Sequence, residues 1–364
     1  MRCLFYGHVI GLGLGHFSRS ARLAEAATAL GASCTVTGGD ESAGRLVRCG
    51  HVSHLPLPAA TVSNLSAGIV VQRERRLLEF LRSDRPDAVI VDLLPFGLGG
   101  ELVAALLAAR QESWPTRFFW GLPYSETRVP ALRNPRLRAA MGQYAGVLVY
   151  EEPDWMDPVP DYRALELPGT IDHVGMVTCP VESGIPRVVL GVIGSGGLAG
   201  GPALLEAFLE AAAPLARRAG LGMRFVTGPL ADLEAMRGIA RGHPDLELVA
   251  RCSVEEAARD AAVVVSRVGY NSAYTLARSD LPLVLVPSTW PEQLRRAALL
   301  AKLDGIWSCS EDDLTDRLPH LLEQALSRGR APRDLPFRVD GADRAARRLA
   351  DLVGDARSGS DPVR

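Results

Sequence analysis

The first residue whose type and place could do chemistry is a histidine at the end of a glycine-rich loop. His16 directly follows Gly11-Leu12-Gly13-Leu14-Gly15, where a predicted strand gives way to a predicted helix. Such a loop lets backbone amides approach an anion at a helix N-terminus. An imidazole titrates near neutral pH, so His16 could act there as a general base toward a hydroxyl or an amine. The alternative is a histidine that only forms a hydrogen bond at the helix N-terminus, and the sequence leaves both interpretations open.

Asp92 is the second candidate for a catalytic role. It ends the apolar run Ala88-Val89-Ile90-Val91, at the edge where parallel sheets bind ligands. From there its carboxylate would either orient His16 or contact a substrate directly. The competing interpretation is a turn or capping aspartate before Leu93-Leu94-Pro95.

The most specific pattern lies in the second half of the chain, in the run Ser266-Arg267-Val268-Gly269-Tyr270-Asn271-Ser272. Gly269 would open a tight turn there. Asn271 and Ser272 would place donors and backbone amides at a helix start, which suits a diphosphate. Arg267 could stabilise the negative charge. Taken singly, Asn271 and Ser272 also fit a simple helix cap.

This run belongs to a longer segment, from about Leu248 to Ile306, which resembles the donor half of GT-B glycosyltransferases. The likeness is greatest to the MurG-like N-acetylglucosaminyltransferases and to the signature box of UDP-sugar-dependent glycosyltransferases. The run is followed by Pro282 to Pro287 and then by Pro291-Glu292-Gln293, which is the order of the corresponding segments in those families. Near the N-terminus, Gly-x-Gly-x-Gly-His-x-x-Arg and the segment Val91 to Gly97 resemble a branch of predicted bacterial glycosyltransferases. The resemblance spans most of the chain.

The resemblance implies a metal-independent, inverting transfer of a hexosyl or N-acetylhexosaminyl group from a UDP- or dTDP-linked donor to a small-molecule acceptor. His16 and Asp92 would be catalytic, and the nucleotide sugar is a co-substrate, so no cofactor is expected. Glu292 also fits a solvated acid in the first turn of a helix. The residues implied in binding are Ser195, Gly196, Gly197, Arg267, Gly269, Asn271 and Ser272 for the donor diphosphate; Glu292 and Gln293 for the donor sugar; Arg251, Cys252, Ser253 and Val254 for the donor base; and Gly13, Gly15, Phe96, Tyr124 and Glu126 for the acceptor.

One position departs from the family pattern. The acid that holds the donor ribose in those families falls at Thr275, and threonine cannot accept both ribose hydroxyls as a carboxylate does. Either the donor is not the usual UDP sugar or the ribose contact comes from another residue. Two alternatives on the same fold stay open: a sugar-nucleotide 2-epimerase, which needs no acceptor, and a catalytically degenerate partner protein of another transferase. No D-x-D triplet of the metal-dependent type is present, so we expect no metal site.

A dinucleotide-binding oxidoreductase is the rival interpretation of the N-terminal glycine loop. Asp40 follows the second predicted strand, where a ribose-binding acid would lie. The dinucleotide fingerprint, however, needs glycine or alanine at the position of His16, because the helix and the strand pack closely there. The pattern therefore disfavours hydride transfer.

These residues have to be positioned by two successive cycles of strand, glycine loop and helix. Strands that are apolar throughout and alternate with helices predict parallel sheets covered on both faces. In the first cycle, strands are expected at Arg2 to Ile10, Cys34 to Thr37, Ala88 to Val91, Thr116 to Trp120, Gly146 to Tyr150 and Ile171 to Met176, and helices at Ser18 to Leu30, Val70 to Arg82 and Glu101 to Arg110. In the second, strands are expected at Val188 to Ile193, Met223 to Val226, Leu246 to Val249, Val263 to Ser266 and Leu283 to Val286, and a helix at Ala203 to Ala219.

We therefore predict an α/β chain of GT-B architecture, in which two Rossmann-like domains turn their parallel sheets toward a central cleft. A length of 364 residues fits two domains. The expected parts are an acceptor-binding domain at 1–175, a linker at 176–186, a nucleotide-sugar-binding domain at 187–340, a helix at 341–353 that crosses back to the first domain, and a disordered tail at 354–364.

The composition limits the classes of binding partner and the cellular location that we expect. A formal net charge of -2 argues against a nucleic-acid partner. The six cysteines form no C-x-x-C pair, which argues against structural zinc and fits free thiols in a reducing cytoplasm. No apolar stretch approaches the roughly 20 residues of a membrane helix, and the N-terminus offers no signal peptide. We expect a cytoplasmic protein without a transmembrane segment, and the sequence leaves a homodimer open.

Overall fold

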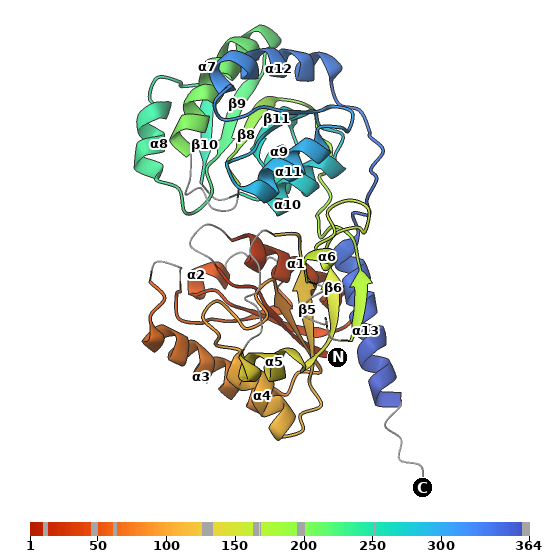
Figure 1. The fold of residues 1–364 in the computed structure, drawn as a ribbon. Helices are drawn as coiled ribbons and strands as arrows, with labels where there is room; N and C mark the ends of the chain where they lie inside the picture. Colours follow the sequence, from red (N-terminus) through yellow and green to blue (C-terminus); the bar gives the residue numbers. More distant parts are fainter. Residues whose placement is uncertain are drawn as a thin grey trace. The chain divides into compact units, whose positions relative to one another are not determined.

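The computed structural model describes residues 1–9, 14–44, 50–60, 64–125, 134–162, 167, 169–194, 201–250 and 252–358, with the side chains of all of these except 42 and 356–358. The chain forms two compact units. The first is Met1–Val177 together with Phe337–Arg364, and the second is Thr178–Pro336. Each unit is built on one parallel sheet with helices packed on it (Figure 1), which confirms the predicted α/β class with two parallel sheets.

The N-terminal unit contains a seven-stranded sheet in the order β3-β2-β1-β4-β5-β6-β7. Every neighbouring pair in it is parallel, so all of its strands end at the same edge. The strand β1 is an interior strand, since Cys3 lies opposite both Cys34 on β2 and Ala88 on β4. The strands are β1 Arg2–Tyr6, β2 Ser33–Thr37, β3 Val52–Leu55, β4 Ala88–Asp92, β5 Arg117–Leu122, β6 Tyr144–Val149 and β7 Thr170–His173.

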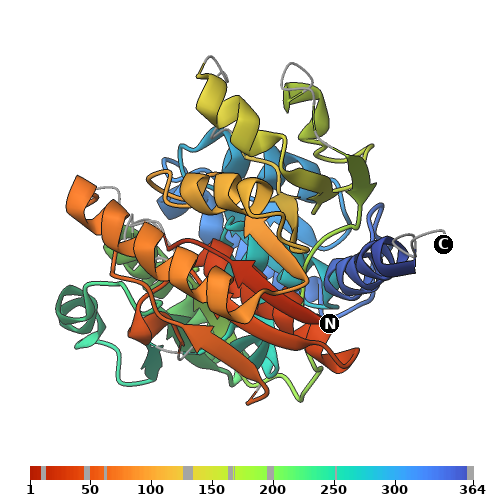
Figure 2. The same cartoon turned by 90° about the horizontal axis from the view of Figure 1, so that it is seen from below.

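Helices cover both faces of this sheet. The helices α3, α4 and α5 lie side by side along one face (Figure 2). On the other face, α1 packs against β1 and β2 and also against α13. Ser66 caps α3 by accepting a hydrogen bond from the Ile69 N–H, which fixes where that helix begins. The helices are α1 Gly15–Ala29, α2 Glu41–Gly44, α3 Ala67–Asp84, α4 Val103–Gln111, α5 Pro135–Met141, α6 Val159–Tyr162 and α13 Gly341–Ser358.

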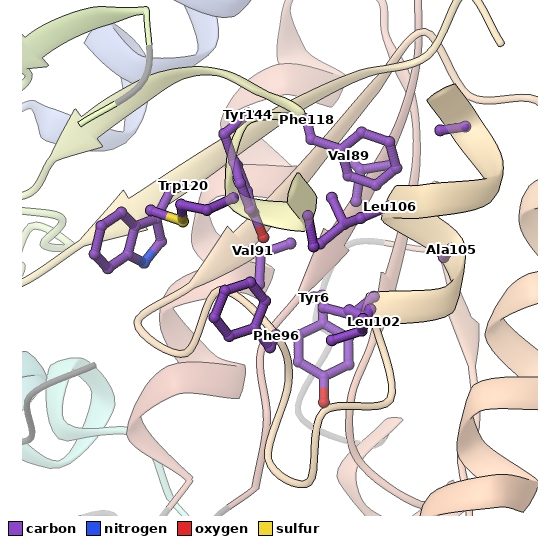
Figure 3. Close-up of a cluster of buried hydrophobic side chains, with 14 of the residues drawn as sticks. Tyr6, Val89, Val91, Phe96, Leu102, Ala105, Leu106, Phe118, Trp120 and Tyr144 are labelled. Carbon is purple, nitrogen blue, oxygen red and sulfur yellow. The ribbon is translucent and has the colours of Figure 1, made fainter. Parts of the chain in front are cut away.

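The strands divide their side chains between the two faces, because successive residues of a strand point in opposite directions. Val89 and Val91 of β4 enter the core on the side of α3 and α4, together with Trp120 of β5 (Figure 3). Ile90 and Asp92 therefore point to the opposite face, where α1 lies. This alternation places the Asp92 side chain on the face of the sheet that α1 covers.

The C-terminal unit repeats the same design with a six-stranded sheet in the order β10-β9-β8-β11-β12-β13, again with every neighbouring pair parallel. On β11, Val263 and Val265 pack into a core with α7 and α12, so Arg267 also points to that side. The strands are β8 Val188–Val192, β9 Gly222–Val226, β10 Leu246–Val249, β11 Ala261–Arg267, β12 Leu283–Val286 and β13 Ile306–Ser308. The helices are α7 Gly201–Ala219, α8 Leu233–Ala240, α9 Val254–Ala258, α10 Tyr270–Arg278, α11 Pro291–Leu300 and α12 Leu314–Arg328.

Several boundaries differ from the sequence-based expectation; the strand expected to run to Ile10, for example, ends at Tyr6. The strand expected to reach Met176 ends at His173, because the Met176 N–H donates to the carbonyl of Arg338 instead. The helix expected to end at residue 353 continues to Ser358, so the first part of the predicted tail is helical. The rest of that tail, 359–364, lies outside the described residues.

Candidate active site

The first candidate site lies where the strand order of the N-terminal sheet reverses. The strands β1 and β4 are neighbours, and the chain leaves them in opposite directions across the sheet. Loops that follow such a pair diverge and leave room for a ligand at the carboxyl edge. Asp92 is the last residue of β4, and His16 lies in the first turn of α1, which follows β1. The topology therefore brings the two predicted catalytic residues to one place.

Asp92 is the centre of a charged cluster. Its carboxylate is fully buried, and Oδ1 lies 2.7 Å from His16 Nδ1. Arg19, one helical turn after His16, donates Nε–H to Oδ2 and Nη2–H to Oδ1, both at 2.7 Å. Burial alone would raise the pKa of the Asp92 carboxyl, but the Arg19 guanidinium and the hydrogen bond from His16 outweigh it and hold that pKa well below its usual range. Asp92 is therefore ionised at neutral pH.

The ionised Asp92 decides where the proton of His16 lies. Two acceptor atoms do not approach to 2.7 Å without a proton between them, and this carboxylate has none, so we assign the proton to Nδ1. Nη2 of Arg19, 3.0 Å from Nδ1, then directs its hydrogen to Asp92. In the neutral form of this imidazole Nε2 carries the lone pair, and it has no hydrogen-bond partner among the described residues. A side chain that is 21% exposed and has this free nitrogen can take a proton from a substrate.

The turn behind Asp92 has an unusual backbone. Leu93 has a φ of 57°, a left-handed conformation that residues other than glycine seldom adopt. Its N–H donates to the Gly121 carbonyl at 2.8 Å, and its own carbonyl accepts from Trp120 Nε1 at 2.8 Å. Both partners lie on β5, so the neighbouring strand holds this turn in place. Strain of this kind persists where the surroundings over-determine it, and it concentrates at functional sites.

Close packing of α1 on β1 brings His16 to the sheet edge. A Cβ on Gly7 would lie 2.5 Å from both the His16 carbonyl oxygen and Ser20 Oγ, so only glycine fits there. The dinucleotide fingerprint places the close-packing glycine on the helix. In this chain it lies on the strand side, which leaves position 16 free to carry a histidine.

A second buried cluster fixes the loops around the same edge. Arg73 of α3 donates to Glu101 Oε1 at 2.8 Å and to the carbonyls of Pro58 at 2.8 Å and Gly38 at 3.2 Å. The Tyr6 hydroxyl donates to Glu101 Oε1 at 2.5 Å. These contacts connect the loops after β2 and β4 to the end of β1. Because every contact is internal to the protein, we interpret this cluster as structural support for the edge.

The second candidate site lies at the corresponding reversal in the C-terminal sheet, where β8 and β11 are neighbours. A Cβ on Gly194, after β8, would lie 3.7 Å from Ser272 Oγ in α10, so the two loops approach each other. Arg296 lies in α11, which follows the neighbouring strand β12. Its guanidinium donates to the carbonyl of Val268 at 3.0 Å and lies over the ring of Tyr270. Segments after three strands therefore converge at one edge.

The start of α10 is suited to an anion. The helix begins after Gly269, which occupies the N-cap position without a side-chain capping bond. Its first N–H groups have no partner within the helix, and such groups bind anions readily. Ser272 does not cap the helix: its hydroxyl lies 3.2 Å from the Gly269 carbonyl and 3.4 Å from the Arg267 carbonyl, inside the turn. Asn271 is half-buried at the helix start.

Arg267 is already paired. Because it points toward α12, its Nη1 reaches Glu311, which lies in the segment before that helix. The arginine side chain is 7% exposed and the glutamate 38%. A diphosphate would have to replace Glu311 to use this charge.

Two residues predicted to bind the donor sugar, Glu292 and Gln293, and the departing position Thr275 lie in the described part of the chain. Gln293 Oε1 accepts from the Ser288 N–H at 3.1 Å, so the loop before α11 uses this oxygen. Glu292 Oε2 is buried and has no hydrogen-bond partner in the described part of the chain. Thr275, at the position where the resemblance implies a ribose-binding acid, is completely buried within the unit.

The predicted base-binding loop has a structural function of its own. Ser253 caps α9 in a capping box, in which its Oγ accepts from the Glu256 N–H at 3.1 Å and its N–H donates to Glu256 Oε2 at 3.3 Å. The Cys252 thiol donates to the same carboxylate at 3.6 Å. The side chains of Cys252 and Ser253 are therefore already hydrogen-bonded at the start of α9.

No family model and no curated protein matches the sequence, but solved structures do. The calicheamicin glycosyltransferase CalG4 matches with a TM-score of 0.61 at 15% identity, over 100% of both chains. MurG from Acinetobacter baumannii matches with a TM-score of 0.53 at 14% identity, over 98% of this chain and 99% of that one. The chain has the GT-B glycosyltransferase fold.

The GT-B fold does not by itself choose a reaction. A putative UDP-N-acetylglucosamine 2-epimerase from Listeria monocytogenes matches with a TM-score of 0.58 at 13% identity, over 99% of this chain and 97% of that one. Within the described ranges, no helix is long and apolar enough to cross a membrane. The same residues contain no group of three His, Cys, Asp or Glu side chains that could hold a metal ion.

The predicted acceptor residues are only partly placed within this GT-B chain. Phe96 is 8% exposed and packs in the core with Tyr6 and Leu102 (Figure 3). Tyr124 is 6% exposed after β5, and Gly15 is the first residue of α1. The predicted site residues outside the described part of the chain are Gly13, Glu126, Ser195, Gly196, Gly197 and Arg251.

Two residues of the first site were not assigned a role from the sequence. Arg19 lies three positions after His16 on the same face of α1, and the His-x-x-Arg spacing was the signal that could have indicated it. His8 lies just after β1, and its ring stacks on that of His16 with centroids 4.3 Å apart. No sequence motif indicated a role for His8.

Proposed function

We propose that this protein is a glycosyltransferase that moves a sugar from a nucleotide-diphosphate sugar to a small-molecule acceptor, with inversion at the anomeric carbon. The observation that carries the proposal is the hydrogen bond between His16 Nδ1 and Asp92, held by Arg19 at the strand reversal of a GT-B chain. This arrangement supplies a base with a fixed tautomer, as deprotonation of a hydroxyl near neutral pH requires.

In the proposed reaction, His16 Nε2 takes the proton of an acceptor hydroxyl or amine while the acceptor atom attacks the anomeric carbon. The bond from that carbon to the diphosphate oxygen breaks, and the nucleoside diphosphate leaves with the electron pair. A single displacement of this kind inverts the anomeric centre. Asp92, 2.7 Å from Nδ1, stabilises the imidazolium. Because Arg19 keeps the Asp92 carboxyl strongly acidic, the proton stays on the imidazole.

We assign the donor to the C-terminal unit. The uncapped start of α10 would receive the diphosphate, since helix N-termini favour anions. Glu292, whose buried Oε2 lacks a partner in the described residues, would accept a hydrogen bond from a sugar hydroxyl. Arg267 would join the diphosphate once Glu311 releases it. UDP and dTDP are the proposed carriers, with the ribose held by a residue other than Thr275.

We expect activity without a divalent cation, because in this scheme His16 supplies the base, and the helix start and Arg267 supply positive charge. Turnover that is unchanged by a chelator is the expected result. Activity that depends on added magnesium would replace this part of the proposal by a metal-assisted departure of the diphosphate.

The 2-epimerase reaction is the second candidate, favoured by the likeness to the Listeria protein. It needs no acceptor, so conversion of a nucleotide sugar to its epimer by the protein alone would select it. A degenerate partner protein would bind donors feebly and turn over none of them.

The test is the substitution His16→Ala, with His320→Ala on the surface of α12 as the matched control. We expect His16→Ala to lower kcat by about 10²- to 10⁴-fold, the usual contribution of a general base, with nucleotide affinity nearly unchanged. The control should retain full activity. Loss of nucleotide binding in His16→Ala would instead make His16 a phosphate ligand.

A further inference from the structure

The N-terminal site contains a histidine that the reaction scheme does not use. His8 lies two residues beyond the end of β1 and is completely buried. Its ring is nearly parallel to that of His16, at an interplanar angle of 25° with the centroids 4.3 Å apart. Neither ring nitrogen of His8 has a hydrogen-bond partner among the described residues. Buried polar atoms without partners are rare in native proteins, and each calls for an explanation.

The surroundings keep His8 neutral. Burial lowers the pKa of His8 well below its ordinary value, and the neighbouring His16 lowers it further. Asp92 acts in the opposite direction but is already paired with Arg19. His8 therefore offers His16 a flat, uncharged ring face.

The His16 ring would have too much freedom without this neighbour. Asp92 fixes one atom of the ring, Nδ1, and a single hydrogen bond leaves rotation about the bond axis and exchange of the two ring nitrogens possible. A parallel ring at stacking distance removes the rotation, because aromatic pairs prefer a defined mutual orientation. The contacts of His8 and Asp92 together define a plane, a tautomer and a direction for Nε2.

We propose that His8 is a positioning residue: its buried ring holds the plane of His16 so that Nδ1 stays on Asp92 and Nε2 faces the substrate. This inference rests on the proposed function in naming Nε2 as the reactive atom. The positioning itself is a property of the protein without substrate, and it can be measured there.

The test compares His8→Phe, which keeps a flat ring, with His8→Ala, which removes it. We expect His8→Phe to retain kcat within about threefold and to raise the melting temperature, since two unpartnered polar atoms disappear. We expect His8→Ala to lower kcat by about 10- to 100-fold at unchanged KM for the donor, the effect of a misplaced catalytic group. The matched control is His54→Phe on β3, whose ring contacts Phe17 edge-on and lies outside the Asp92 cluster.

A spectroscopic readout separates this proposal from the function. In protein labelled with ¹⁵N-histidine, NMR should show His16 as a single Nδ1–H tautomer in the wild type and in His8→Phe, and as a mixture in His8→Ala. A single tautomer and full kcat in His8→Ala would overturn the proposal. Equal losses of kcat in the alanine and phenylalanine variants would also overturn it, since the ring nitrogens and not the ring face would then matter. If the wild type proves to be no transferase, the tautomer measurement still decides the positioning.

Discussion

The buried pair of Arg19 and Asp92 allows a prediction about stability and catalysis at once. Asp92 is fully buried and Arg19 is 2% exposed, and two hydrogen bonds of 2.7 Å join them. Removing one partner of such a pair costs about 3–5 kcal/mol, because the other charge stays buried without compensation. We expect a loss of this size for Arg19→Met and, separately, for Asp92→Leu.

The double variant is the informative one. With both charges replaced by apolar side chains of similar volume, most of the penalty disappears, since a buried ion pair contributes little relative to good apolar packing. We therefore expect the Arg19→Met, Asp92→Leu protein to lie within about 2 kcal/mol of the wild type. The hydrogen bond from His16 is lost and accounts for about 1 kcal/mol of that difference. Its turnover should stay as low as that of Asp92→Leu, because nothing then fixes the tautomer of His16.

The assay is urea unfolding of the four proteins of this cycle, together with kcat for each. The exposed pair Arg75 and Glu79 on α3, with side chains 80% and 55% exposed, serves as the control cycle and should show coupling below about 1 kcal/mol. Stability losses that simply add in the double variant would refute the buried-pair argument. Full turnover in Asp92→Leu would refute the orienting role of the carboxylate.

Three further predictions follow from the same contacts. Gly7→Ala places a Cβ 2.5 Å from the backbone of α1, so we expect a loss of about 1–3 kcal/mol and a lower kcat; a melting temperature equal to that of the wild type would contradict this. Glu311→Gln releases Arg267, so calorimetry should show tighter binding of the preferred nucleoside diphosphate, and weaker binding would exclude Arg267 from the diphosphate site. The pKa values of Asp92 and Glu101 are lowered in the folded protein. Their ionised carboxylates therefore stabilise the folded state fully above the unfolded pKa of about 4, and this stabilisation is lost as the pH falls below that value. A melting temperature that does not fall between pH 5 and pH 3 would contradict this assignment.

The proximity of His16 and Asp92 follows from simple periodicity, while their catalytic roles stay a prediction. An apolar strand that ends in Asp92, and a glycine loop that leads into a helix with His16, suffice to bring both residues to the carboxyl edge of one parallel sheet. The alternation of Val89, Ile90, Val91 and Asp92 then selects the face on which α1 lies. Topology supplies the rest, because β1 and β4 are neighbours at the strand reversal.

Contacts between residues far apart in the chain were not predictable in this way. Glu311 follows Arg267 by 44 positions, so their pairing depends on how the segment before α12 is placed. The complete burial of Thr275 depends on how α10 packs. The stacking of His8 on His16 requires the close approach at Gly7. Such contacts arise from tertiary packing, and one sequence carries no local signal for them.

Weak local signals explain the elements that were missed. The strand β3, Val52–Leu55, has four residues of which only the two ends are buried, and β13, Ile306–Ser308, has three. Val52–Leu55 shows neither a continuous apolar run nor alternation, and Ile306–Ser308 is too short to show a period. Both lie at sheet edges, where pairing with a neighbouring strand, not their own composition, holds them.

The measurement that tests the central claim most directly is calorimetric titration of the protein with UDP, dTDP, GDP, ADP and CDP, with and without magnesium. We predict that one of these binds without the metal and stabilises the fold by about 2.7 kcal/mol at one hundred times its Kd. Binding should be lost in Asn271→Asp, which puts a negative charge at the start of α10, and kept in Asn134→Asp, the same change at the cap of α5, where aspartate also caps well. Failure of all five to bind, or equal binding by Asn271→Asp, would contradict the assignment of a nucleotide-sugar donor to this site.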